Sequence, residues 1–154
     1  MCKEDLLNRL LGTWQLVSSV VHFENGVFYD QFGHNPSGFL IYTADGYVSA
    51  VLGASNRPLL ATNEPGNATD AEFASEASTF IAYCGRFTVD DKTKSVSHEM
   101  AACLFPNWVG HSEKRAVTFI DDQLILLTDF RTRCDDGRRY QVEVTWKRPA
   151  QSAT

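Results

Sequence analysis

The feature that most constrains the fold of this chain is a succession of short stretches in which apolar and polar side chains alternate. In residues 138–148 every second side chain is apolar: Tyr140, Val142, Val144 and Trp146. A period of two is typical of a β-strand with one buried and one solvated face. Asn25-Gly26 and Asp45-Gly46 lie between such stretches and are typical of tight hairpin turns. The chain is therefore predicted to consist mainly of antiparallel strands.

The alternation predicts about nine strands, over residues 13–22, 27–32, 39–42, 47–52, 84–90, 95–105, 114–120, 123–130 and 138–148. Joined in sequence by hairpins, they favour an all-β fold, an up-and-down antiparallel β-barrel of about 8–10 strands. Closure is favoured because many strands are apolar on one face and no sheet edge is visibly protected. A two-sheet sandwich is the alternative. At 154 residues, we expect one domain over residues 1–154.

Two helical segments interrupt the strands. Leucines at i, i+3 and i+4 spacing predict a short amphipathic helix over Lys3–Leu11, ended by Gly12. Residues 53–68 lose the alternation and form a long loop, and loops of this length often serve as lids or functional segments. Residues 69–72 have the composition of a capped helix start. The apolar stripe of this inserted helix is predicted at Phe73, Ala77, Phe80 and Ile81.

The composition excludes several classes of partner. The net charge of -5 and the pI of about 5.3 argue against nucleic acid, and no basic run suggests a membrane surface. No apolar run is long enough to span a bilayer. The N-terminal stretch carries acidic residues and does not resemble a signal peptide, so we expect a cytoplasmic protein with reduced thiols. The four cysteines form no CxxC pair and are predicted to be free thiols, mostly buried packing residues: Cys2, Cys84, Cys103 and Cys134.

Motifs for cofactor chemistry are missing from the sequence. The four histidines show neither HxH nor HExxH spacing: His22, His34, His98 and His111. A metal site is therefore unsupported. The chain contains no glycine-rich phosphate loop between a strand and a helix, and no GxSxG elbow. We expect no cofactor, so any catalysis must rely on acid/base groups and on the shape of the site.

Several blocks of the sequence resemble a known family. Gly12-Thr13-Trp14 resembles the Gly-X-Trp of lipocalins, and residues 36–50, 83–87 and 104–110 are similar to the small intracellular lipocalin-like domain proteins of bacteria and fungi. The resemblance covers nearly the whole chain. It implies a calycin-type barrel with an inner cavity, whose closed end Trp14 would plug. Family members resemble ligand binders, and some lipocalin-fold relatives act as cofactor-free cyclases or isomerases. The disulfides of secreted lipocalins are not apparent.

The hairpin over residues 84–105 can be registered from its turn at residues 91–94. The register places three pairs on the inner face: Phe87 with His98, Gly85 with Met100, and Tyr83 with Ala102. Arg86 then faces Glu99 on the outside of the barrel. We predict a cross-strand ion pair between these two, contributing about 0.2–1 kcal/mol, and therefore a structural role for Arg86.

His98 is the one imidazole on an otherwise apolar strand face, and Gly85 is expected to leave space beside it. An unpaired histidine in an apolar wall has a lowered pKa and stays neutral at pH 7, as a general base requires. The alternative is a core histidine bonded to a backbone carbonyl or to a tyrosine. In a barrel with an internal cavity, both interpretations stay open.

Two further polar residues and one aromatic residue are candidates near the mouth. Tyr83 is predicted to donate a hydrogen bond to a ligand carbonyl, or else to be a rim aromatic. Arg115 shares its parity with Val117, and inside the barrel it would need an anionic partner, from the protein or from the ligand. A position past the rim, in water, is favoured for Arg115. Trp108 lies on a loop and either contacts the ligand or caps the core, whereas His111 is expected to be a loop histidine.

These inferences define a candidate site. The candidate catalytic residues are His98, Tyr83 and Arg115. The candidate ligand-binding residues are Ser18, Phe39, Ile41, Tyr47, Ser49, Phe87, Met100, Leu104, Trp108 and Tyr140. His22 is also predicted on the inner face.

Two hypotheses for function follow, and both require a small hydrophobic, oxygenated molecule in the barrel. The first is a cofactor-independent isomerase, cyclase or dehydratase of specialised metabolism, in which His98 moves a proton while Tyr83 or Arg115 polarises a carbonyl. The second is a non-catalytic intracellular carrier or binder of a hydrophobic metabolite. The polar groups on the inner faces favour the enzyme, and a homodimer stays open.

Overall fold

The structure is a computed structural model and describes residues 5–152. Its helices are α1 (Leu6–Leu10) and α2 (Asp70–Ser78), with two 3-10 turns, η1 (Pro65–Asn67) and η2 (Pro106–Trp108). Its strands are β1 (Gly12–Phe23), β2 (Phe28–Asp30), β3 (Ser37–Tyr42), β4 (Tyr47–Gly53), β5 (Phe80–Asp90), β6 (Ser95–Cys103), β7 (Ser112–Ile120), β8 (Gln123–Thr128), β9 (Arg131–Thr132) and β10 (Arg139–Lys147). Cys2 and the start of the predicted N-terminal helix, at Lys3, lie outside the described residues.

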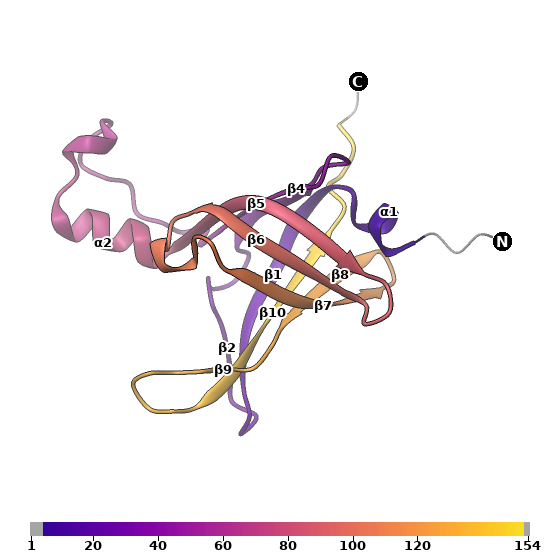
Figure 1. Ribbon diagram of the computed structural model, residues 1–154. Coiled ribbons are helices and arrows are strands. Elements are labelled where there is room, and N and C mark those ends of the chain that lie inside the picture. The colour runs from indigo at the N-terminus through magenta and orange to yellow at the C-terminus, as the bar shows by residue number, and fades with distance from the viewer. Residues whose placement is uncertain (1–4, 153–154) are drawn as a thin grey trace.

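The strands close into an antiparallel barrel (Figure 1). Their order in the sheet is β2-β1-β3-β4-β5-β6-β7-β8-β10-β9, and β1 also pairs with β10. Eight strands form the closed barrel, while the short β2 and β9 add to β1 and β10. The predicted all-β up-and-down barrel with two helices is therefore confirmed, and the two-sheet alternative is excluded.

The helix α1 closes one end of the barrel. Its side chains Leu6 and Leu10 are buried, and the Leu6 amide donates to Oδ1 of Asp91 in the β5–β6 turn at 3.3 Å. Trp14 is only 3 % exposed and donates from Nε1 to the carbonyl of Leu10 at 2.8 Å. The plugging position that the resemblance implied for Trp14 is confirmed.

The helix α2 and the loop before it lie at the opposite end (Figure 1). Thr69 Oγ1 accepts from the amide of Glu72 at 3.2 Å, and Glu72 Oε2 accepts from the amide of Thr69 at 2.8 Å. This reciprocal capping box confirms the predicted helix start. No side chain of α2 is buried, and the predicted stripe residues Phe80 and Ile81 belong to β5 instead. The loop and α2 therefore stand beside the open end of the barrel.

A bulge in β1 changes which side chains point inward. The register with β10 shifts between Leu16 and Ser18. Side chains before the bulge keep the predicted face, but after it Ser19 and Val21 are buried instead of Ser18 and Val20. The inner-face prediction for Ser18 and His22 is therefore corrected, because the extra residue reverses the parity of the strand.

The predicted register of β5 and β6 is confirmed up to a second bulge. The structure pairs Val89 with Val96, Phe87 with His98, Arg86 with Glu99 and Gly85 with Met100. The register then shifts between Cys84 and Gly85, so that Tyr83 faces Cys103 and not Ala102 as predicted. Parity counted from the hairpin turn holds only until a bulge inserts an extra residue.

Gly85 serves a different purpose from the one predicted. A Cβ atom at this position would lie 1.8 Å from the carbonyl oxygen of Glu99. The glycine therefore allows the two backbones to approach closely at the bulge, and the expectation that it leaves space beside His98 is corrected.

The predicted ion pair between Arg86 and Glu99 does not form, although the two residues face each other across the strands. Among residues 5–152, the Arg86 guanidinium instead donates to the hydroxyl of Tyr47 at 3.1 Å and lies over its ring at 4.8 Å. A planar guanidinium stacks well on an aromatic face, and this neighbour on β4 competes with the carboxylate on β6.

The hairpin of β3 and β4 has apolar side chains on both faces. Its inner positions are Leu40, Tyr42, Val48 and Ala50, all completely or almost completely buried. The candidate ligand-binding residues Phe39, Ile41, Tyr47 and Ser49 lie on the outer face. Their inward placement is corrected: because both faces of this hairpin are apolar, hydropathy alone could not decide the parity.

Candidate functional site

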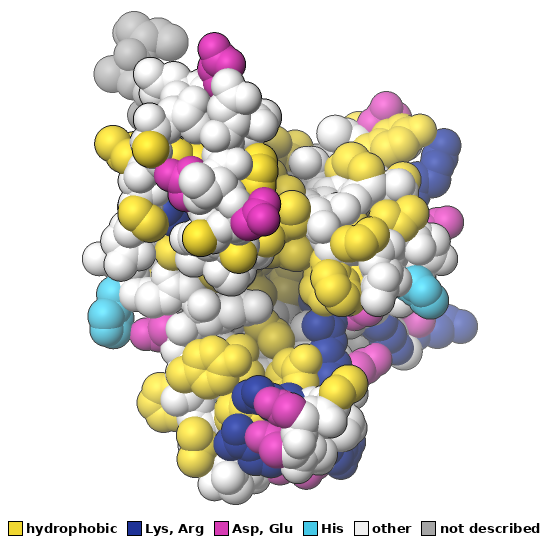
Figure 2. Space-filling view, turned by 90° about the vertical axis from the view of Figure 1, so that its left-hand side faces the viewer, with side chains coloured by type: hydrophobic (Ala, Val, Ile, Leu, Met, Phe, Trp, Pro, Cys, Tyr) yellow, Lys and Arg dark blue, Asp and Glu magenta, His cyan; other side chains and the backbone are white. Residues whose placement is uncertain are grey.

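A cavity opens at the end of the barrel that α1 leaves open. Its volume is about 760 Å³, within the range of small-molecule sites. Figure 2 looks onto this end and shows a recess bordered by hydrophobic side chains, with positive charge at its lower edge. Half of its lining residues are large and apolar: Phe32, Leu40, Leu52, Phe80, Ile81, Leu104, Phe105, Trp108, Leu126, Val142, Val144 and Trp146.

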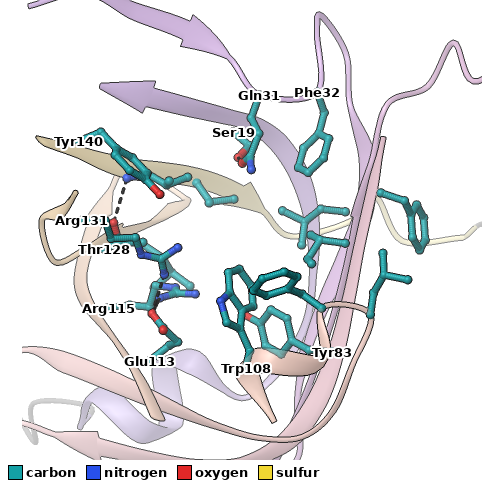
Figure 3. Close-up of a pocket in the computed structure, with 18 of the residues that line it drawn as sticks. Ser19, Gln31, Phe32, Tyr83, Trp108, Glu113, Arg115, Thr128, Arg131 and Tyr140 are labelled. Carbon is teal, nitrogen blue, oxygen red and sulfur yellow. Dashed lines mark hydrogen bonds and ion pairs between the residues drawn. The ribbon is translucent and has the colours of Figure 1, made fainter. Parts of the chain in front are cut away.

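A charged cluster forms one wall of this cavity (Figure 3). The carboxylate of Glu113 on β7 pairs with Arg131 of β9 at 2.5 Å and with Arg115 of β7 at 3.5 Å. All three side chains are mostly buried, and Arg115 is the most enclosed of them. Two guanidinium groups share one carboxylate, so the wall carries one net positive charge toward a mostly apolar space.

The position of Arg115 inside the barrel corrects the favoured prediction, which placed it past the rim in water. On β7, Glu113, Arg115 and Val117 alternate inward with exposed residues between them. The carboxylate two residues before Arg115 provides the anionic partner that a buried guanidinium requires. Extending the parity of Arg115 by two residues identifies Glu113 from the sequence, and we missed this signal.

Behind the cavity, His98 links two tyrosines. Its Nε2 lies 2.7 Å from the Tyr42 hydroxyl, and its Nδ1 lies 2.8 Å from the Tyr83 hydroxyl. His98 is completely buried. Burial, together with the smaller effect of the Arg115 charge, lowers the pKa of His98 from 6.5 to about 3. The imidazole is therefore neutral at pH 7, and one ring nitrogen donates while the other accepts.

The two tyrosines of this chain differ in their access to the cavity. Tyr83 lines the cavity, whereas Tyr42 lies in the core and does not. Burial raises the pKa of Tyr83, and the positive charge of Arg115 partly offsets this rise. Burial also raises the pKa of Tyr42, well above its ordinary value. Both phenols are therefore protonated at neutral pH. Of the two tyrosines bonded to His98, Tyr83 is the one that a ligand in the cavity can contact.

The structure brings only part of the predicted site together. Five candidates line the cavity: Tyr83, Leu104, Trp108, Arg115 and Tyr140. His98, Phe87 and Met100 point into the barrel as predicted, but they lie in the core and are not among the lining side chains. The remaining candidates lie outside the barrel wall.

The aromatic residues at η2 border the mouth. Trp108 and Phe105 make an edge-to-face contact with ring centroids 5.4 Å apart, and Arg131 lies over the Trp108 ring at 5.4 Å. Trp108 therefore joins the apolar lining to the charged wall (Figure 3). Both of its predicted roles, ligand contact and cap, are compatible with this position.

Further lining residues were missed by the sequence analysis. Ser19 Oγ donates to Oε1 of Gln31 at 2.8 Å on the side of β1, opposite the charged wall (Figure 3). Thr128 lines the cavity beside Arg131. Trp146 lines it as well, and its buried Nε1 has no hydrogen-bond partner among the described residues. The β1 bulge hid Ser19. Gln31 lies in the turn after the short β2, although the sequence predicted a strand there, and Arg131 lies on β9, whose two residues show no alternation.

Among residues 5–152, no group of three or more His, Cys, Asp or Glu side chains is placed to hold a metal ion. No helix in this part of the chain is both long and apolar enough to cross a membrane.

Comparison with known proteins gives a family match over most of the chain. The profile of the family described as "Lipocalin-like domain" matches residues 11–149. A curated relative, the 4'-hydroxy-3'-methoxypropiophenone carrier protein ppsC of Aspergillus oryzae, is 39% identical over 66 residues. The match covers 39% of this chain and 60% of the relative, so it spans less than two thirds of the relative's length.

Proposed function

Because the chain belongs to the lipocalin-like domain family, we propose that its cavity binds a small, hydrophobic, oxygenated organic molecule and carries it in the cell. One observation supports this proposal above all others. The cavity is mostly apolar, with Ser19 and Gln31 on one side, and on the opposite wall Tyr83, Arg115 and Arg131 present hydrogen-bond donors. Such a site favours a mostly apolar molecule that has an oxygen acceptor at one end.

The relative supports the same class of molecule. Its name describes a carrier of a propiophenone, an aromatic ketone that also bears a hydroxyl and a methoxy group. The aromatic ring and ethyl group of such a ketone suit the aliphatic and aromatic lining, and its oxygens suit the charged wall. We therefore propose an aromatic ketone as the first ligand to test on this protein.

A second candidate function is the cofactor-independent isomerase, cyclase or dehydratase of specialised metabolism. The observation that favours it is the position of Tyr83 and Arg115 on one wall, where they could polarise a carbonyl. His98 makes no direct contact with the cavity, so a proton would have to pass between it and the ligand through the Tyr83 phenol. The low pKa of His98 makes it a weak base, and for this reason we place the carrier first.

We propose a cytoplasmic location for either function. Cys84, Cys103 and Cys134 are free thiols in the structure, which suits a reducing compartment. Cys84 and Cys134 are exposed and Cys103 is half-buried, which corrects the prediction that the thiols are mostly buried.

Titration calorimetry with 4'-hydroxy-3'-methoxypropiophenone tests ligand binding. We expect saturable binding to the wild type, and at least about tenfold weaker binding to Leu126→Phe, whose larger side chain occupies the cavity. Leu59→Phe is the matched control, because this loop side chain is 98% exposed and the substitution should leave the affinity unchanged. Equal affinity in all three proteins would contradict binding in the barrel.

Proton exchange separates the carrier from the enzyme. In heavy water, an enzyme that forms the enolate of the same ketone would replace the CH₂ protons next to the carbonyl with deuterium. As a carrier, the protein should leave the exchange rate at that of buffer. Acceleration that is lost in His98→Gln, with binding intact, would instead establish the acid/base function.

A further inference from the structure

Two hydrogen bonds join Tyr42, His98 and Tyr83, and the surroundings of these side chains determine which atom donates in each bond. The neutral imidazole of His98 carries one hydrogen, on either Nδ1 or Nε2, and each nitrogen faces one phenol. If Nε2 carries the hydrogen, it donates to Tyr42 and the Tyr83 hydroxyl donates to Nδ1. If Nδ1 carries it, both hydrogen bonds run the other way.

Tyr42 distinguishes these two arrangements. Its side chain is 1% exposed, and its hydroxyl has His98 Nε2 as its only hydrogen-bond partner among the described residues. With the hydrogen on Nε2, the Tyr42 oxygen would accept and its own hydrogen would be buried without a partner. Leaving a buried donor unsatisfied disfavours this tautomer by at least about fivefold. With the hydrogen on Nδ1, Tyr42 donates to Nε2, so the Tyr42 hydroxyl hydrogen and the His98 ring hydrogen each have a partner.

We infer that Tyr42 holds His98 as the Nδ1–H tautomer, so that Tyr83 accepts from His98 and directs its own hydroxyl hydrogen into the cavity as a donor to the bound molecule. Tyr42 and His98 are then positioning residues, and Tyr83 is the residue that contacts the ligand. Neither role requires His98 to take up a proton.

The groups around Tyr83 reinforce this arrangement. The positive charge of Arg115 acts on the Tyr83 phenol. Its guanidinium has no acceptor atom, so it cannot accept the Tyr83 hydroxyl hydrogen. Thr128 Oγ1 accepts from the amide of Val142 at 2.9 Å, which leaves its hydroxyl hydrogen available as well. The one carboxylate of this wall, that of Glu113, is paired with both Arg115 and Arg131. The wall therefore offers mainly donors, together with one net positive charge.

This wall selects a ligand oxygen that only accepts hydrogen bonds: a ketone carbonyl, or the enolate or phenolate oxygen that such a molecule forms. The ligand class rests on the proposed function, whereas the tautomer of His98 does not. The two can therefore fail separately, because the tautomer is measurable in the protein without ligand.

Nitrogen-15 NMR of the histidine side chains tests the tautomer directly. The signals of His98 are those absent from His98→Gln among the four histidines of the chain. In the wild type at pH 7 we expect Nδ1 at the shift of a protonated nitrogen and Nε2 at that of a bare one. The reverse assignment, or an even mixture of the two, would overturn the inference.

A matched pair of ligands tests donation into the cavity. 4'-Hydroxy-3'-methoxypropiophenone and 2-methoxy-4-propylphenol differ only in a carbonyl that the second replaces with CH₂. We expect the wild type to prefer the ketone by about tenfold, the value of one well-formed hydrogen bond, and Tyr83→Phe to lose most of this preference. Tyr29→Phe, which removes an exposed hydroxyl outside the cavity, is the control and should keep the preference.

The outcomes of the two experiments are distinct. An unchanged ketone preference in Tyr83→Phe would overturn the donation, whatever the tautomer. If neither molecule binds while Nδ1 carries the hydrogen, the proposed ligand class is refuted and the direction of the two hydrogen bonds is upheld.

Discussion

The two ends of the barrel use similar strands to opposite effect. At the closed end, α1 and Trp14 fill the interior, and Leu10 and Leu124 beside them are completely buried. At the open end, the same barrel leaves a cavity of about 760 Å³. Packed cores contain few voids larger than a water molecule. A void of this size inside a well-packed protein therefore indicates a binding site. The closed end shows that the same barrel packs densely where it has no binding site.

The two regions also differ in whether their buried hydrogen-bond donors have partners within the protein. At the closed end, Trp14 Nε1 donates to Leu10, and the Arg148 guanidinium lies over the Trp14 ring and donates to the carbonyls of Thr13 and Arg9. In the cavity lining, Trp146 Nε1 has no partner among the described residues. Donors that the protein itself satisfies stabilise the fold, whereas unsatisfied donors beside a cavity are available to a ligand.

The largest expected effect comes from removing the plug. Trp14→Ala should lower the free energy of unfolding by about 3–5 kcal/mol, because the side chain is buried and the surrounding helix cannot collapse into the space. Phe105→Ala, at the half-exposed mouth, should cost less than about 1 kcal/mol. Urea denaturation of the two variants measures this contrast, and similar losses would contradict the division into a packed end and an open end.

Acid should destabilise the protein through His98. Burial lowers the pKa of His98 to about 3, so the folded protein keeps this imidazole neutral while the unfolded chain protonates it below about pH 6.5. The contribution of the neutral His98 to the free energy of unfolding is complete above pH 6.5 and is lost as the pH falls toward 3. Between pH 7 and pH 5 we expect a loss of about 2 kcal/mol from this residue, measured by urea denaturation at each pH.

Two histidine variants isolate this effect. His98→Gln should reduce the slope of stability against pH, whatever its effect on stability at pH 7. His34→Gln should leave the slope unchanged, because this side chain is 94% exposed. An equal slope in the wild type and in His98→Gln would show that His98 titrates normally in the folded protein.

The smallest expected effect concerns α2, which contributes no buried side chain to the open end. Thr69→Ala removes the side chain that caps the helix and should destabilise α2 locally by about 1 kcal/mol. Amide exchange within α2 should accelerate severalfold, while global unfolding by urea stays nearly unchanged. Thr62→Ala, in the preceding loop, should change neither quantity. A large global loss in Thr69→Ala would show that α2 is part of the cooperative core.

The barrel could be predicted from the sequence because hairpin turns and alternation act locally. The alternation predicted the wrong face for side chains that follow a bulge. One extra residue in β1 placed Ser19 inward and His22 outward. The failure on β3 and β4 has another cause. Phe39 and Leu40 are both apolar, so only the closed barrel decides which of them is inside.

The candidate site was predictable to the extent that it lies on regular strands. Tyr83 and Arg115 were selected from strand positions, and both line the cavity. Arg131 reaches the same wall from β9, a strand of two residues whose sequence shows no alternation. The partners of His98 depend on three-dimensional packing, because Tyr42 lies 56 residues away along the chain.

The indole N–H signals of the three tryptophans test the central claim most directly. Trp14 lies at the closed end, whereas Trp108 and Trp146 line the cavity. In a titration with 4'-hydroxy-3'-methoxypropiophenone, we expect the signals of Trp108 and Trp146 to shift saturably and that of Trp14 to stay unchanged. A shift confined to Trp14, or equal shifts of all three signals, would contradict a ligand site at the open end of the barrel.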